Sequence, residues 1–179
     1  MEKLTSPVLA AVVTYNAQAH IQDCLTALRG AGSWPVPVYV VDNASTDQTR
    51  DLIQGMAIPE LALDELPENR GVAAAFNLIL GQAERIGARW VLLLDQDSRC
   101  HPQCLDILFE HAEALLQAGN NVGALCPTVY SRKFPQIVHM PYIWDGRYLQ
   151  HVELGPEHDT VRVDSGISSG TLYSVQALL

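Results

Sequence analysis

Three short runs of consecutive apolar residues constrain the fold of this chain more than any other feature. They cover residues 8–13, 38–41 and 90–94, and none approaches the ~20 residues of a membrane-spanning helix. Unbroken apolar runs of this length are typical of strands that are buried on both faces of a parallel sheet. The sequence therefore predicts an α/β fold with these three runs as strands.

Amphipathic helices are predicted between and after these strands. Residues 21–28 and 71–86 repeat apolar side chains at helical spacing, and glycines follow both segments. A further helix is predicted from Pro102, which suits a first helical position, to Gly119, which closes it. Strands that alternate with helices indicate a Rossmann-like, mostly parallel sheet flanked by helices.

The pattern changes after Gly123, where helical periodicity is lost and prolines become frequent. We expect one domain over 1–179, with a βαβ half over 1–120 and an irregular, partly antiparallel half over 121–179. The short strands predicted in the second half are 124–126, 137–140, 161–163 and 171–173.

Composition excludes several classes of protein. The net charge of -9 argues against nucleic acid as a partner, because binding to a phosphate backbone needs a basic surface. The four cysteines show no paired spacing, which favours reduced thiols and a cytoplasmic location. The N-terminus has no apolar signal segment, and no run is long enough for a transmembrane helix. Peripheral association of the full protein with the inner face of the membrane is left open.

Each of the three predicted strands is followed by a polar cluster. Because the carboxyl ends of parallel strands meet at one edge of a sheet, we expect these clusters to converge where ligands bind. Local roles are an alternative: Asn16 could be a helix cap, and Ser45 or Thr46 could cap the next helix with Asp47 in its first turn. These roles would leave Asp42 unexplained. The clusters are Thr14-Tyr15-Asn16, Asp42 to Asp47 and Asp95-Gln96-Asp97.

The two carboxylates of Asp95 and Asp97 would repel each other unless a cation lies between them. Mg²⁺ and Mn²⁺ bind one or two carboxylates together with water and the phosphates of a substrate. A divalent cation would also neutralise a diphosphate ligand on this acidic chain. The pair therefore predicts a Mg²⁺ or Mn²⁺ site with Asp97 and Asp95 as ligands.

Five ordered motifs resemble glycosyltransferase family 2, most closely its rhamnosyltransferase-like branch. The resemblance implies a GT-A fold and an inverting transferase that uses a nucleotide-diphosphate sugar, with UDP and dTDP as the expected carriers. It also implies a divalent metal cofactor and a role in cell-surface polysaccharide synthesis. The motifs are VVTYN (12–16), VVDNASTDQT (40–49), ENRGVAAAFN (68–77), LLLDQDS (92–98) and SSGTLYS (168–174).

The resemblance also implies roles for individual residues. Thr14 and Tyr15 would line the base pocket, and Asp42 would hydrogen-bond the pyrimidine ring. Asp95 would face the ribose or the metal, and Asp97 would be the principal metal ligand. The remaining residues expected to contact the nucleotide are Asn16, Asn43, Asn69, Arg70, Gly71 and Gln96.

One part of the family pattern is missing. The catalytic base of the family is a carboxylate beyond the motif at 168–174, and no acidic residue follows Tyr173. We therefore expect an N-terminal, donor-binding part of the enzyme, with the catalytic base unassigned. The complete enzyme would move a sugar, rhamnose by resemblance to the branch, to a saccharide or lipid-linked acceptor. The alternative is a nucleotide-sugar binding module, or an inactive fragment, without catalysis.

Overall fold

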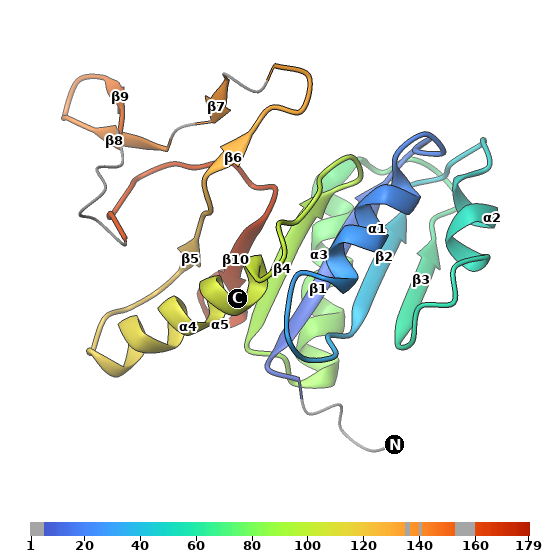
Figure 1. Ribbon diagram of the computed structural model, residues 1–179, viewed down its shortest axis with the longest axis horizontal. Coiled ribbons are helices and arrows are strands. Elements are labelled where there is room, and N and C mark those ends of the chain that lie inside the picture. The colour runs from blue at the N-terminus through green and yellow to red at the C-terminus, as the bar shows by residue number, and fades with distance from the viewer. Residues whose placement is uncertain (1–5, 135–136, 140, 153–159) are drawn as a thin grey trace.

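A six-stranded sheet forms the centre of the molecule, in the strand order β3-β2-β1-β4-β10-β5 (Figure 1). The computed structural model describes residues 6–134, 137–139, 141–152 and 160–179. The first four strands along the chain run parallel to one another, and β10 runs antiparallel to both of its neighbours. The strands are β1 (Val8–Thr14), β2 (Val38–Asp42), β3 (Leu61–Glu65), β4 (Trp90–Asp95), β5 (Ala124–Leu125) and β10 (Thr171–Ser174).

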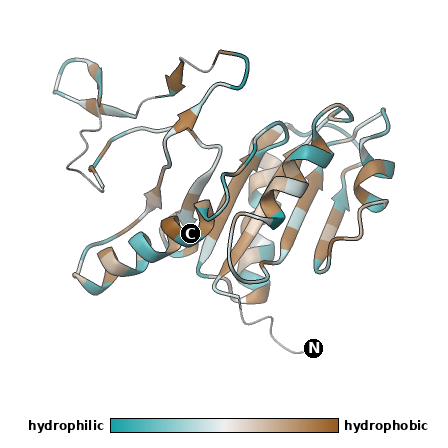
Figure 2. Ribbon diagram, viewed as in Figure 1, coloured by the Kyte–Doolittle hydropathy of each residue, from teal (hydrophilic) through white to brown (hydrophobic). Residues whose placement is uncertain are grey.

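Helices cover both faces of this sheet, and alternate residues of β1 supply the two cores. Val8, Ala10 and Val12 pack with side chains of α1, α2 and α4, whereas Leu9 and Ala11 pack with α3 and α5. This explains why the central strands are apolar at nearly every position before their polar last residues, and why much of the sheet is brown in Figure 2. The helices are α1 (Ile21–Arg29), α2 (Thr49–Gln54), α3 (Gly71–Ile86), α4 (Cys104–Gln117) and α5 (Val175–Leu178).

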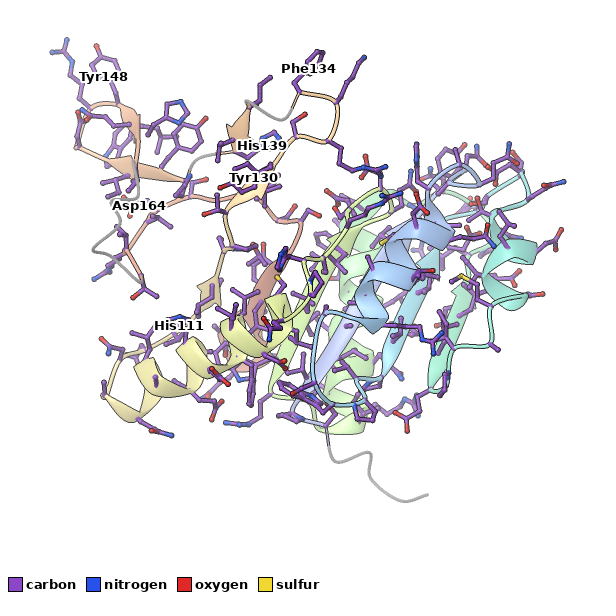
Figure 3. All side chains as sticks on the ribbon, in the orientation of Figure 1. His111, Tyr130, Phe134, His139, Tyr148 and Asp164 are labelled. Atoms are coloured by element: carbon purple, nitrogen blue, oxygen red, sulfur yellow. The ribbon has the colours of Figure 1, made fainter. Side chains whose placement is uncertain are left out.

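Two short hairpins project from the second half of the chain, outside the main sheet (Figure 1). Their outer ends carry exposed aromatic side chains, among them Phe134 and Tyr148, which point away from the main sheet in Figure 3. The hairpin strands are β6 (Val129–Tyr130) with β7 (Val138–His139), and β8 (Tyr142–Trp144) with β9 (Leu149–His151).

The three strands and the helices predicted over 21–28 and 71–86 are confirmed. The prediction for Pro102 was wrong, because α4 begins at Cys104 after Gln103 adopts a left-handed φ of 69°. Residues 161–163 form no strand, since no neighbouring segment of the described chain pairs with them. Strand β7 covers two of the residues predicted over 137–140, and Met140 lies outside the described residues.

Within the part of the chain that the structure describes, no helix combines the length and the apolar composition needed to span a membrane. The division of the chain at residue 120 stays a prediction. Strands β10 and β5 of the second half extend the same sheet as β1 and β4, so the two halves of the chain share one sheet.

Candidate functional site

The polar clusters after β1, β2 and β4 meet at one edge of the sheet, because these strands are parallel neighbours. Gln96 joins the first cluster to the third: its side-chain oxygen accepts hydrogen bonds from the Tyr15 N–H at 2.7 Å and the Thr14 hydroxyl at 3.3 Å. Asn16 joins the first cluster to the second, since its N–H donates to Ser45 Oγ at 2.9 Å. The predicted convergence is therefore confirmed.

A cavity of about 380 Å³ opens between these clusters and the start of α3. Most of the predicted nucleotide-contacting residues line it, but Asn16, Asp42 and Arg70 do not. None of its lining residues is cationic, and two are carboxylates. The residues that line it are Val13, Thr14, Tyr15, Asn43, Asn69, Gly71, Val72, Asp95, Gln96 and Asp97.

Asp95 and Asp97 lie together on this cavity, as the sequence predicted. The side chain of Asp95 opens to the cavity but is partly desolvated by the surrounding chain. This desolvation raises the pKa of Asp95, and the negative charge of Asp97 raises it further. Two adjacent carboxylates are a suitable donor set for a hard divalent cation.

The described residues contain no group of three or more His, Cys, Asp or Glu side chains placed to hold a metal ion. A cation bound by Asp95 and Asp97 would therefore need further ligands from water and from a bound phosphate. Mg²⁺ and Mn²⁺ are commonly bound in this way, so the residues present fit such an ion.

The segment that carries the two carboxylates is held from the second half of the chain. Ser169 is buried, and its Oγ accepts a hydrogen bond from the Asp95 N–H at 3.0 Å and lies 2.5 Å from Ser98 Oγ. Ser169 was not predicted as a site residue. It belongs to the SSGTLYS motif, which is the sequence signal that could have identified it.

Asp42 has a different environment from the one predicted. It is fully buried, and its carboxylate accepts hydrogen bonds from the Ser45 N–H at 2.9 Å, the Ser45 hydroxyl and Arg50 Nε at 2.5 Å. Arg50 also lies 3.3 Å from Glu65. In the structure Asp42 thus faces Ser45 and Arg50 rather than the cavity, and its hydrogen bond to a pyrimidine stays a prediction.

The local alternatives for the second cluster are partly wrong. Ser45 does not cap α2, because its N–H and hydroxyl both contact Asp42. Asp47 was predicted in the first turn of this helix but lies just before it, where its carboxylate accepts a hydrogen bond from the Thr49 N–H at 3.0 Å.

One wall of the cavity lies at the start of α3, where Asn43, from the segment after β2, and Asn69 accept hydrogen bonds from backbone N–H groups. Asn43 Oδ1 accepts a hydrogen bond from the Arg70 N–H at 2.8 Å, and Asn69 Oδ1 accepts one from the Gly71 N–H at 3.0 Å. Gly71 has a φ of +77°, a left-handed backbone conformation that glycine adopts without steric strain.

Several residues in and around the cavity were not predicted from the sequence. Val13 and Val72 give the lining an apolar part, and Arg50 holds the buried Asp42. The apolar character of both valines was visible, but nothing local in the sequence says that Val72, on the first turn of α3, faces a cavity.

Comparison with known proteins identifies a family and several relatives of this chain. A family model described as glycosyl transferase family 2 matches residues 10–161. A galactofuranosyltransferase from Mycolicibacterium smegmatis is 30% identical over 169 residues, which are 94% of this chain and 52% of the relative. An N-acetylglucosaminyl-diphospho-decaprenol L-rhamnosyltransferase from Mycobacterium tuberculosis is 28% identical over 158 residues, 84% of this chain and 50% of the relative.

Solved structures confirm the fold. S. aureus TarS in complex with UDP-GlcNAc superposes with a TM-score of 0.62 at 22% identity, over 94% of this chain and 45% of TarS. A mannosyltransferase from Pyrobaculum calidifontis in complex with GDP-Man and Mn²⁺ has a TM-score of 0.55 at 28% identity, over 74% of this chain and 39% of that protein. The predicted GT-A-type fold is therefore correct, and this chain spans about half the length, or less, of the relatives it matches.

Proposed function

Since the chain belongs to glycosyl transferase family 2, we propose that it forms the donor-binding part of a glycosyltransferase that uses a nucleotide-diphosphate sugar. The observation that carries this proposal is the pair Asp95 and Asp97 on a cavity at the carboxyl ends of β1, β2 and β4. Relatives of this chain are named as transferases of galactofuranose and rhamnose, which supports a role in polysaccharide synthesis.

The charge of the cavity supports a metal-dependent mode of binding. A diphosphate would meet two carboxylates and no cationic side chain among the lining residues. This repulsion is relieved if Asp95 and Asp97 hold Mg²⁺ or Mn²⁺, which when bound would stabilise the departing diphosphate. The mannosyltransferase with 28% identity was solved with GDP-Man and Mn²⁺, which is consistent with this assignment.

The protein groups would bind and orient the donor. Tyr15 is 44% exposed and Val72 is 54% exposed, so both offer apolar surface to a nucleobase. Gln96 and Ser169 hold the carboxylate segment in place through hydrogen bonds to the Tyr15 N–H and the Asp95 N–H. The donor would thus lie between a rigid segment after β4 and the first turn of α3.

The finer predictions remain proposals. They are an inverting displacement at the anomeric carbon, rhamnose as the sugar, UDP or dTDP as the carrier and a saccharide or lipid-linked acceptor. The catalytic base is unassigned. Among the acidic residues that precede the SSGTLYS motif, Glu153, Glu157 and Asp159 lie outside the described residues, and Asp164 accepts a hydrogen bond from the Trp144 N–H.

Thermal unfolding with UDP, dTDP and GDP, each with and without Mn²⁺, tests the proposal. A ligand at 100 times its Kd stabilises the folded state by about 2.7 kcal/mol, which raises the Tm of a chain of this size by about 5–10 °C. We expect a Mn²⁺-dependent rise that Asp97→Asn abolishes. Glu84→Gln, on the exposed side of α3, is the matched control and should keep it.

No Mn²⁺-dependent rise with any nucleotide, in a cooperatively unfolding wild-type chain, would contradict the proposal. An assay of sugar transfer and donor hydrolysis then separates the enzyme from the alternative. A non-catalytic binding module would show the Tm rise without either reaction.

A further inference from the structure

Two half-buried cysteines, Cys100 and Cys104, follow the segment that carries the carboxylates. Their thiols share a hydrogen bond, so the two side chains are in contact. Both pack against the core cluster that α1, α2 and α4 share with the sheet, yet both stay partly exposed. The proposed donor site gives neither thiol a role.

A turn of the backbone just before α4 brings the two thiols together. Gln103 adopts a left-handed φ of 69°, and the Cys104 N–H donates a hydrogen bond to the His101 carbonyl at 3.0 Å. Cys104 is the first residue of α4 and lies four positions after Cys100. Because the thiols already touch across this turn, a bond between them needs only local movement of the chain.

The other two cysteines have different surroundings. Cys24 is only 1% exposed, and its thiol donates to the Asp95 carbonyl at 3.5 Å, so solvent does not reach it. The sulfur of Cys126 lies against Gly166, where an added Cβ would come within 2.7 Å of it. Among the four free cysteines, Cys100 and Cys104 are therefore the pair that combines mutual contact with access to solvent.

We propose that Cys100 and Cys104 form a redox-sensitive thiol pair, which a peroxide oxidises reversibly to a disulfide that weakens metal-dependent binding of the donor. The thiol pair stands apart from the proposed function, but its effect on donor binding rests on that function. Reversible disulfides of this regulatory kind occur even in reducing compartments, where structural disulfides are rare.

The oxidation balances with hydrogen peroxide as the oxidant. The Cys104 thiolate attacks one peroxide oxygen, the O–O bond breaks, and the leaving hydroxide takes up the thiol proton to form water. The Cys100 thiol then attacks the resulting sulfenic sulfur, so that the S–S bond forms and a second water leaves. The two thiols together lose two electrons, and dithiothreitol restores them by exchange. Cys104 is the attacking group, since the hydrogen bond from Cys100 lowers its pKa.

The disulfide would act on the carboxylates through a short length of chain. It places the two sulfur atoms about 2 Å apart, roughly 1.5 Å closer than sulfur atoms in van der Waals contact. Cys100 lies two residues after Ser98, whose Oγ is 2.5 Å from Ser169 Oγ, and Ser169 also accepts the Asp95 N–H. Even part of such a displacement lengthens a hydrogen bond beyond its working range, so we expect the segment of Asp95 and Asp97 to lose its anchor.

Peptide mapping tests the thiol pair without any nucleotide. The reduced chain is treated with hydrogen peroxide, blocked with iodoacetamide, and cut with trypsin and with a protease that cleaves before aspartate. Cleavage after Arg99 and before Asp106 releases residues 100–105, in which Cys100 and Cys104 are the only cysteines. We expect this peptide to have lost two hydrogens and to carry no label, whereas after reduction both thiols should be labelled.

Calorimetric titration with UDP and Mn²⁺ tests the effect on the site, after peroxide or reductant has been removed. We expect a Kd about 10-fold higher for the oxidised wild type than for the reduced chain, and recovery on reduction. Cys104→Ser should keep its Kd after peroxide treatment. Cys126→Ser is the matched control, because it removes a half-buried cysteine outside the pair and should respond like the wild type.

Labels retained on both thiols after peroxide treatment would overturn the inference, and so would a disulfide that joins other cysteines. A Cys100–Cys104 disulfide that leaves the Kd for UDP unchanged would also overturn it. Failure of the reduced wild type to bind UDP would instead contradict the proposed function, and peptide mapping would still decide whether the thiol pair exists. Cys100→Ser takes the place of Cys104→Ser if the latter, at the first residue of α4, fails to fold.

Discussion

Replacement of Ser169 by alanine tests how the carboxylate segment is held. The Ser169 hydroxyl lies between the Asp95 N–H, at 3.0 Å, and Ser98 Oγ, at 2.5 Å, and the serine is only 4% exposed. Ser169→Ala removes one small atom, so the cavity it leaves is minor. The main effect is that the Asp95 N–H loses its acceptor at a partly buried position.

A buried donor left without a partner costs about 1–3 kcal/mol. Because the Asp95 N–H is only partly buried, we expect a loss in the lower part of this range, about 1–2 kcal/mol. For a chain of this size the Tm should fall by about 3–8 °C. The segment 95–97 would also be less well fixed, so the Mn²⁺-dependent binding of UDP should weaken.

The assay is thermal unfolding of both proteins, followed by calorimetric titration with UDP and Mn²⁺. Ser168→Ala is the matched control, because Ser168 is the adjacent residue, is half-buried and makes no side-chain hydrogen bond within the described residues. The control should stay within about 0.5 kcal/mol of the wild type. If Ser169→Ala melts and binds UDP like Ser168→Ala, the hydroxyl does not hold the segment and the reasoning is refuted.

Two further predictions concern groups next to the cavity. Arg50→Met should lower the urea concentration at half-unfolding, because the buried Asp42 carboxylate loses the guanidinium at 2.5 Å; an unchanged midpoint would show that the pair contributes nothing. Burial, with the charges of the two nearby carboxylates, raises the pKa of Cys24 to about 12, whereas a hydrogen bond from Cys100 lowers the pKa of Cys104. Since the thiolate is the reactive form, iodoacetamide should label Cys104 from a lower pH than Cys24, as followed by peptide mass spectrometry; equal labelling at pH 8 would contradict this order.

The parts of the fold that could be predicted are those whose signal is local. The strand at Val8–Thr14 and its two parallel neighbours are apolar at nearly every position because helices cover both faces. Strand β3 (Leu61–Glu65) was missed because it lies at the sheet edge, where only alternate residues are half-buried and two of the five are acidic. Its pattern resembles that of a solvated loop.

In the candidate site, the local sequence likewise does not predict which individual side chains face the cavity. Asp42 and Asp95 occupy equivalent positions, each as the last residue of a central parallel strand. One is fully buried against Arg50, and the other opens to the cavity. The difference arises from partners far away in the sequence, so the local pattern predicts where the carboxylates gather but not which of them face a ligand.

The contacts of β10 indicate that the first 120 residues do not complete the site by themselves. Strand β10 pairs antiparallel with β4, with Thr171 opposite Leu93, and so covers what would otherwise be an exposed edge of the sheet next to Asp95. Ser169, two residues before Thr171, then accepts the Asp95 N–H. The sheet register and this hydrogen bond place the support of the carboxylates in the second half of the chain. The predicted boundary at residue 120 therefore divides the chain by pattern, whereas the cavity with its carboxylates depends on residues from both sides of it.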